Sequence, residues 1–132
     1  MELSATLDAL TSDPAIVGRR VQAIWLFGSH ARGDARADSD IDLAILCEPP
    51  LGAQRLAVMD RVGNALGVDI DLVDLAIAPP VLVWEIVTTG RLVLEAEPRT
   101  VEDFLRRSRF AAEDESRRLR MVVLAQTGSE RP

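Results

Sequence analysis

Two aspartates separated by one residue, Asp40 and Asp42, are the part of this sequence best suited to chemistry. They open an apolar run, and in a β-strand successive side chains face opposite sides. Asp40, Asp42 and Ala44 then share one face, while the other face is formed by apolar residues, namely Ile41, Leu43, Ile45 and Cys47. Two carboxylates on one strand face lie about 7 Å apart, so both can ligate one divalent ion or bracket a pair. Hard oxygen ligands of this kind favour Mg²⁺ or Mn²⁺.

A Gly28-Ser29 pair supplies the second half of the pattern. It ends the apolar run Val21–Phe27, and ten residues separate it from Asp40. Glycine allows a sharp turn and the close approach of a phosphate, and a serine hydroxyl beside exposed backbone N–H groups can donate to phosphate oxygens. One strand would therefore deliver a phosphate-binding turn and the next strand metal ligands. Phosphoryl and nucleotidyl transfer both use this combination.

The segment GSHARGDARADSDIDL, residues 28–43, resembles the signature of the DNA-polymerase-β-type nucleotidyltransferase superfamily. It is most similar to the minimal nucleotidyltransferases (MNT) of prokaryotes, including the antitoxins of HEPN/MNT toxin–antitoxin pairs. The resemblance covers roughly Leu3 to Leu94. It implies an α/β (α+β) fold with a small mixed β-sheet of the polymerase-β palm type, helices on one side and a C-terminal helix.

Hydrophobic periodicity predicts the elements that position these residues. We expect one minimal nucleotidyltransferase domain over residues 1–132, with a core at about 15–95 and a C-terminal helix at about 99–125. Strands are expected at 21–27, 40–47, 68–76 and 91–94, and helices at 3–10, 54–66 and 81–88. Gly67 is well placed to end the second of these helices, and Thr100 to begin the C-terminal one as its N-cap.

The strand at 68–76 offers a third carboxylate. Asp69 and Asp71 fall on one of its faces, and Asp74 lies at its end. The resemblance implies that a third acid completes the metal site, and Asp71 matches that position best. Asp69 remains an alternative. The simplest alternative to a site is a set of solvated carboxylates that protect exposed strand ends from pairing.

The resemblance also implies an activity and a partner. The chain would be a Mg²⁺-dependent nucleotidyltransferase that moves AMP from ATP to a tyrosine hydroxyl of a cognate HEPN ribonuclease toxin. Asp40 and Asp42 would hold two metal ions, and Asp71 would favour the attacking alkoxide. Four residues would serve the nucleotide: Gly28 and Ser29 by holding the β- and γ-phosphates, Ser39 by orienting Asp40, and Arg32 by contacting phosphate unless it pairs with Asp34 or Asp38.

Composition narrows the class of ligand. The net charge of −6 argues against a groove for nucleic acid, because proteins bind nucleic acid through clusters of positive charge. The chain has no lysine, so a P-loop is excluded, and no tyrosine, so it cannot modify a tyrosine of its own.

Neither a secretory signal nor an apolar run long enough for a bilayer is visible, and we expect a cytoplasmic protein. Cys47 is expected to be an inert core thiol, and His30 a surface turn residue.

Two other functions fit the same residues. A non-catalytic antitoxin could neutralise its partner by binding through the C-terminal helix, which mixes acids and arginines around an apolar stripe. That helix could equally pack on its own domain or mediate homo- or hetero-oligomers. The second alternative is a nucleotidyltransferase for a small molecule such as an aminoglycoside, because acidic pockets attract cations.

Overall fold

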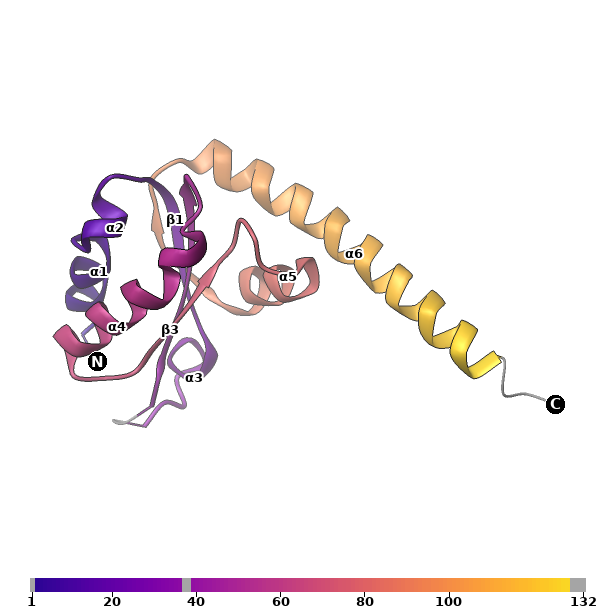
Figure 1. The fold of residues 1–132 in the computed structure, drawn as a ribbon, viewed down its shortest axis with the longest axis horizontal. Coiled ribbons are helices and arrows are strands. Elements are labelled where there is room, and N and C mark those ends of the chain that lie inside the picture. The colour runs from indigo at the N-terminus through magenta and orange to yellow at the C-terminus, as the bar shows by residue number, and fades with distance from the viewer. Residues whose placement is uncertain (1, 37–38, 129–132) are drawn as a thin grey trace.

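A mixed sheet of four strands, in the order β3-β2-β1-β4, organises the molecule in our computed structural model (Figure 1). The structure describes residues 2–36 and 39–128. Strand β1 is antiparallel to both β2 and β4, whereas β2 runs parallel to β3. The strand bounds are β1 Arg20–Phe27, β2 Ile41–Glu48, β3 Ile70–Asp74 and β4 Arg91–Glu95. The mixed sheet expected from the resemblance is therefore confirmed.

Helices and turns connect these strands in chain order. Their bounds are α1 Leu3–Thr11, α2 Pro14–Val17, α3 Gly28–Arg32, the 3₁₀ turn η1 Gly52–Gln54, α4 Arg55–Leu66, α5 Pro80–Thr89 and α6 Pro98–Gly128. Gly67 ends α4 in the left-handed conformation, as predicted. The predicted cap at Thr100 is wrong, because α6 already begins at Pro98, whose fixed φ suits the first turn of a helix.

Each face of the sheet has its own hydrophobic core. On one face, Ile24, Leu43 and Leu72 pack against residues of α1, α2 and α4. On the other face, Trp25, Ala44 and their neighbours pack against α5 and the beginning of α6. The alternation within β2 therefore separates Asp42, on the Ala44 face, from the Leu43 face. Cys47 is buried in the first core, as predicted.

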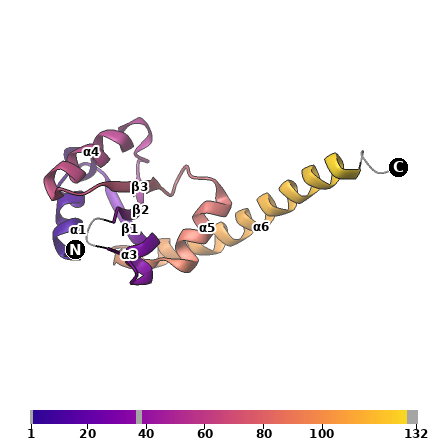
Figure 2. The ribbon, with the colours of Figure 1, turned by 90° about the horizontal axis from the view of Figure 1, so that it is seen from below.

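Helix α6 packs on the sheet only with its first part. Its Phe104 ring lies 6.3 Å from the ring of Trp25, and Arg20 of β1 pairs with Glu97 at 2.8 Å, just before the helix. Further along, α6 contacts α5 through Glu115, and its outer part extends away from the other elements as a single rod (Figures 1 and 2). Within residues 2–36 and 39–128, no helix combines the length and the apolar character that a membrane crossing requires.

A buried carboxylate joins α2 to α4. The Asp13 side chain is only 2% exposed, accepts the Ala15 N–H at 2.9 Å as the N-cap of α2, and receives two hydrogen bonds from Arg61 at 2.8 and 2.9 Å. The hydrogen bond from Arg61 is the largest cause that lowers the pKa of Asp13, and it outweighs the opposing effect of burial. Asp13 therefore fixes the helical layer behind the sheet.

We expect Asp13→Ala to lower the free energy of unfolding by about 2–4 kcal/mol at pH 7, because both the cap and the ion pair are lost. Asp13→Asn should cost less, since asparagine also caps helices. A lowered pKa stabilises the fold above the unfolded pKa, and this contribution disappears as the pH falls through the folded pKa. Urea denaturation at pH 7 and in acid checks both points; an equal gap between wild type and Asp13→Asn at both pH values contradicts the assignment.

Candidate active site

Asp42 lies in the middle of the candidate site because β2 is an inner strand of the sheet. The antiparallel register places it opposite Phe27, the last residue of β1. The parallel register places it beside Asp71 of β3. Neighbouring strands are about 4.8 Å apart, so the side chains of Asp42 and Asp71 occupy adjacent positions at the same edge of the sheet. The structure thus brings together two of the three predicted carboxylates.

Gly28 covers the Asp42 carboxylate from the side of β1. Its φ is +70°, a conformation that L side chains rarely adopt. A Cβ at this position would overlap Oδ2 of Asp42 and would lie 3.0 Å from its Cγ. Any other residue would therefore push the carboxylate out of place. The requirement for glycine at the end of β1 comes from backbone conformation and from close packing together.

The environment of Asp42 opposes its negative charge. Burial is the largest cause of its raised pKa, followed by the charge of Asp71 and then that of Asp40. His30 and Arg32 act in the opposite direction, and they are too weak to cancel the rise. The site therefore holds more negative charge than its own cations offset.

Asp40 and Asp42 have different acidic neighbours at the beginning of β3. It lines a groove beside α4 together with Asp69, whose carbonyl accepts the Ile41 N–H at 3.0 Å. Asp69 therefore borders Asp40, whereas Asp71 borders Asp42. Because Asp71 and Asp40 both raise the pKa of Asp42 and Asp69 is not among the causes, the geometry favours Asp71 over Asp69 as the third acid.

The donor set suits a hard cation. Asp42 and Asp71 lie side by side at one edge of the sheet, and a cation between them would relieve the charge repulsion that contributes to the raised pKa of Asp42. In the part of the chain that the structure describes, however, no three Asp, Glu, His or Cys side chains are close enough together to form a metal site as they stand. The assignment of metal ions to Asp40, Asp42 and Asp71 stays a prediction.

The segment between the two strands differs from the predicted turn, because residues Gly28–Arg32 form the short helix α3. His30 is half-buried in it, and its Nε2 lies 3.3 Å from the Ser39 carbonyl. The Ser39 hydroxyl accepts the Arg36 N–H at 2.8 Å, which differs from the predicted contact with Asp40. Arg32 pairs with Asp34 at 3.4 Å; Asp38, the other predicted partner, lies outside the described residues. The nucleotide-binding roles of Gly28, Ser29, Arg32 and Ser39 stay predictions.

Asp74 has a structural role that the sequence did not reveal. Its side chain is buried, and it accepts the backbone N–H groups of Gly52 and Ala76, each at 3.2 Å. These bonds fix the loop after β2 to the end of β3. The carboxylate of Asp74, at the end of β3, therefore binds backbone N–H groups and lies apart from Asp71 along the strand.

The raised pKa of Asp42 makes its ionised form a cost to the folded state. A carboxylate of this kind gives the greatest stability below about pH 4, the ordinary pKa of aspartate, and loses it as the pH rises through the raised value. We therefore expect Asp42→Asn to unfold at a higher temperature than wild type at pH 7 without divalent ions, and the difference to vanish below about pH 4.

Calorimetry with and without millimolar Mg²⁺ measures these differences. A cation that binds the native carboxylates should raise the wild-type unfolding temperature and leave Asp42→Asn nearly unchanged. Asp69→Asn is the matched control, because Asp69 is not among the causes of the shift. A lower unfolding temperature for Asp42→Asn than for wild type at pH 7 contradicts the electrostatic account.

Two curated relatives carry the name of one activity. Protein adenylyltransferase MntA of Shewanella oneidensis is 40% identical over 73 residues, which are 54% of this chain and 52% of the relative. The chain thus matches about half the length of that relative. Probable protein adenylyltransferase MntA of Haemophilus influenzae is 32% identical over 109 residues, which are 74% of this chain and 92% of the relative.

Solved structures with the same fold come from toxin–antitoxin complexes. A crystal structure of a toxin–antitoxin with AMP-PNP contains a chain that is 26% identical, with a TM-score of 0.77 and coverage of 96% of this chain and 98% of that one. A structure of a tri-AMPylated Shewanella oneidensis HEPN toxin in complex with MNT antitoxin matches with 25% identity and a TM-score of 0.66, covering 95% of this chain and 91% of that one.

The Polymerase beta, Nucleotidyltransferase family matches residues 15–99, which include every residue of the candidate site, and this chain belongs to that family.

Proposed function

We propose that this chain is a protein adenylyltransferase that transfers AMP from ATP to a tyrosine hydroxyl of a cognate HEPN toxin and thereby acts as its antitoxin. The observation that carries the proposal is the position of Asp42, between Gly28 of the β1–α3 junction and Asp71 of β3. The names of the two curated relatives and the toxin complexes of the solved relatives support it. The proposed location is the cytoplasm, where ATP and such a partner meet.

The residues of the site have distinct tasks in this reaction. The hydroxyl oxygen forms a bond to the α-phosphorus of ATP, the bond between the α-phosphorus and the bridging oxygen breaks, and pyrophosphate leaves. Asp71 accepts the hydroxyl proton, for which its exposed carboxylate is accessible. Gly28 leaves room for the phosphates and Ser29 donates to them, while His30 and Arg32 add positive charge nearby.

Asp40, Asp42 and Asp71 would hold Mg²⁺, with two ions expected and Mn²⁺ as a possible substitute. When bound, such ions stabilise negative charge on the entering and leaving oxygens of a phosphoryl group. ATP is the proposed donor because the relatives are adenylyltransferases and one solved relative was crystallised with AMP-PNP. The absence of tyrosine from this chain directs the transfer to a partner rather than to a tyrosine of the chain itself.

The transfer reaction is tested with α-phosphate-labelled ATP, Mg²⁺ and the purified HEPN protein of the same cell. Wild type should label the HEPN protein, and Asp42→Asn should reduce the rate by at least about 10³-fold, because charge stabilisation of the phosphoryl group is lost. Asp69→Asn is the control, which keeps the activity if Asp71 is the third acid. Neutralisation of the toxin by both wild type and Asp42→Asn, with no label in either, contradicts the enzyme and supports the binding-only antitoxin.

The packing of Gly28 gives a second test. Gly28→Ala should lower the transfer rate by about 10²-fold, because its Cβ displaces the Asp42 carboxylate. Gly33→Ala is a matched control: Gly33 also has a positive φ, +79°, and nothing lies within 4 Å of a Cβ placed there. In both variants, backbone strain should lower the free energy of unfolding by roughly 1–2 kcal/mol. Equal loss of activity in the two variants would count against the role of the Gly28–Asp42 contact.

A further inference from the structure

The outer part of α6 continues a helix face that the sheet covers further in. Val101, Phe104 and Ala112 are buried at intervals typical of one helix face. After Glu115, whose side chain contacts α5, the next positions on this face are Leu119 and Val122, which are 57% and 54% exposed. Residues 117–128 extend α6 by about 18 Å at 1.5 Å per residue. The apolar stripe is therefore longer than the surface that its own domain offers.

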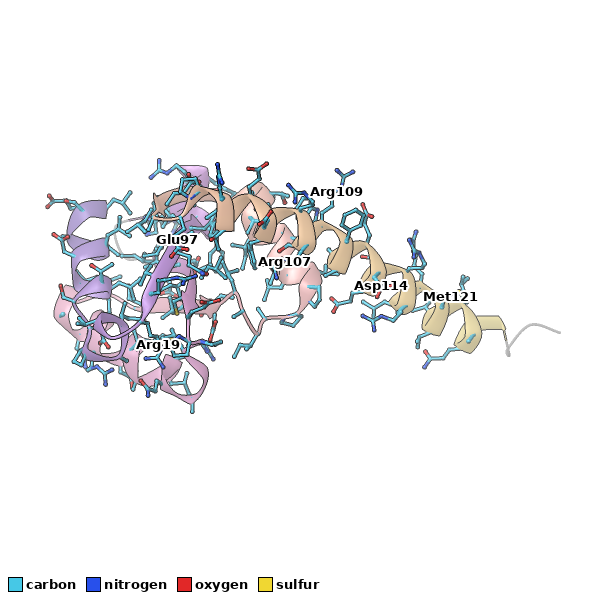
Figure 3. The ribbon with its side chains drawn as sticks, turned by 90° about the horizontal axis from the view of Figure 1, so that it is seen from above. Arg19, Glu97, Arg107, Arg109, Asp114 and Met121 are labelled. Atoms are coloured by element: carbon cyan, nitrogen blue, oxygen red, sulfur yellow. The ribbon has the colours of Figure 1, made fainter. Side chains whose placement is uncertain are left out.

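A cleft lies where α6 leaves the domain. Glu115 accepts the Val81 N–H of α5 at 3.1 Å, which fixes the angle between the two helices. Beside this contact, a cleft of about 450 Å³ is lined by the half-buried Trp84 of α5 and by Ser116, Arg117 and Arg120 of α6, among others. Figure 3 shows Met121 on the outer stretch of α6, past the last of the other elements. Leu119 and Val122 of the exposed stripe are neighbours along α6 of Arg120, which lines the cleft.

The charges of the cleft indicate the chemistry of its occupant. Arg106, Arg109 and Arg118 of α6 each pair with an acid of the same helix. Of the charged residues that line the cleft, Glu113 pairs with Arg109 at 3.4 Å, whereas Arg117 and Arg120 take part in no ion pair within the described residues. Two uncompensated guanidinium groups beside an indole ring suit carboxylates, which arginine binds with two parallel hydrogen bonds. This basic and apolar surface belongs to a chain whose net charge is −6.

We propose that the cleft and stripe form a docking site for one amphipathic α-helix of the partner protein, with acidic residues beside its apolar face. A helix covers a straight apolar stripe along its whole length, because the ridges of one helix fit the grooves of the other. Its carboxylates pair with Arg117 and Arg120, and an apolar side chain contacts Trp84. The docking site rests on the proposed function in one respect: the partner is taken to be the HEPN protein.

A second copy of this chain fits the surface less well. An isologous interface places the same patch on both sides. Pairing two copies around residues 117–120 would bring Arg117 and Arg120 of both chains together, and like charges would oppose the contact. A partner that carries carboxylates has the opposite, favourable effect.

Binding of the full chain to the purified HEPN protein, measured by calorimetry without ATP, tests the docking site. Arg117→Glu/Arg120→Glu should weaken binding by at least about 100-fold, as expected for charges at the centre of an interface. Arg118→Glu lies outside the cleft and should weaken binding by less than about 5-fold, as typical of a rim charge. Leu119→Ser/Val122→Ser should weaken binding by at least about 10-fold and leave the unfolding temperature unchanged, because both side chains are already exposed.

The outcomes separate docking from catalysis. Loss of binding in the cleft variants, with Asp42→Asn binding as wild type does, supports the docking site whether or not AMP is transferred. Transfer without any effect of the cleft variants on binding overturns the docking site and leaves the proposed function intact. A wild-type dimer that the cleft variants convert to a monomer, or binding of RNA in place of the HEPN protein, also overturns it.

Discussion

The close packing around Asp42 is the constraint on which the rest of the site depends. An aspartate on an inner strand is partly buried, next to another carboxylate, and in contact with a backbone that tolerates no side chain. Each of these conditions opposes the ionised form or limits its movement. Carboxylates with a perturbed pKa are concentrated at functional sites, so this arrangement favours a functional role for Asp42.

The hydrophobic cores on the two faces of the sheet support this arrangement in different ways. The core under α1, α2 and α4 fixes the strand order that places β1 and β3 on either side of β2. Asp13 and Arg61 join two of those helices at a distance from the site. The opposite core, under α5 and α6, lies on the face from which Asp42 projects. The helices that Asp13 and Arg61 join thus lie on the sheet face opposite to Asp42, whereas α5 and α6 lie on the same face as Asp42.

Much of the fold and part of the site could be predicted from the sequence, for identifiable reasons. Alternation in the Asp strand identified its two faces, and Gly67 marked the end of α4, because period and glycine conformation are local properties. The helical conformation of Gly28–Arg32 could not be predicted, because a five-residue helix made of polar and small residues has no hydrophobic period. The burial of Asp74 depends on Gly52, 22 positions away, which no local pattern encodes.

The choice between Asp69 and Asp71 shows the same limit. Both acids lie on one strand face in the sequence pattern, and alternation cannot separate them. The parallel register between β2 and β3 separates them, since it aligns Asp71 with Asp42 and leaves Asp69 beside Asp40. A register is a property of two strands together, and these two parallel strands are joined by a crossover connection through α4. Site residues that depend on register therefore need the structure.

The proposed catalytic site and the proposed docking site carry charges of opposite sign. Carboxylates accumulate at Asp42, which projects from the face that α5 and α6 cover, whereas Arg117 and Arg120 lie on α6 beside α5. A partner with acidic residues is attracted to α6 and repelled from the carboxylates, so it can dock without occupying the site. In the proposed function, this separation would leave the site open for ATP and for an acceptor hydroxyl. An antitoxin that acts by chemistry needs such an arrangement, since it must hold its partner and still admit a nucleotide.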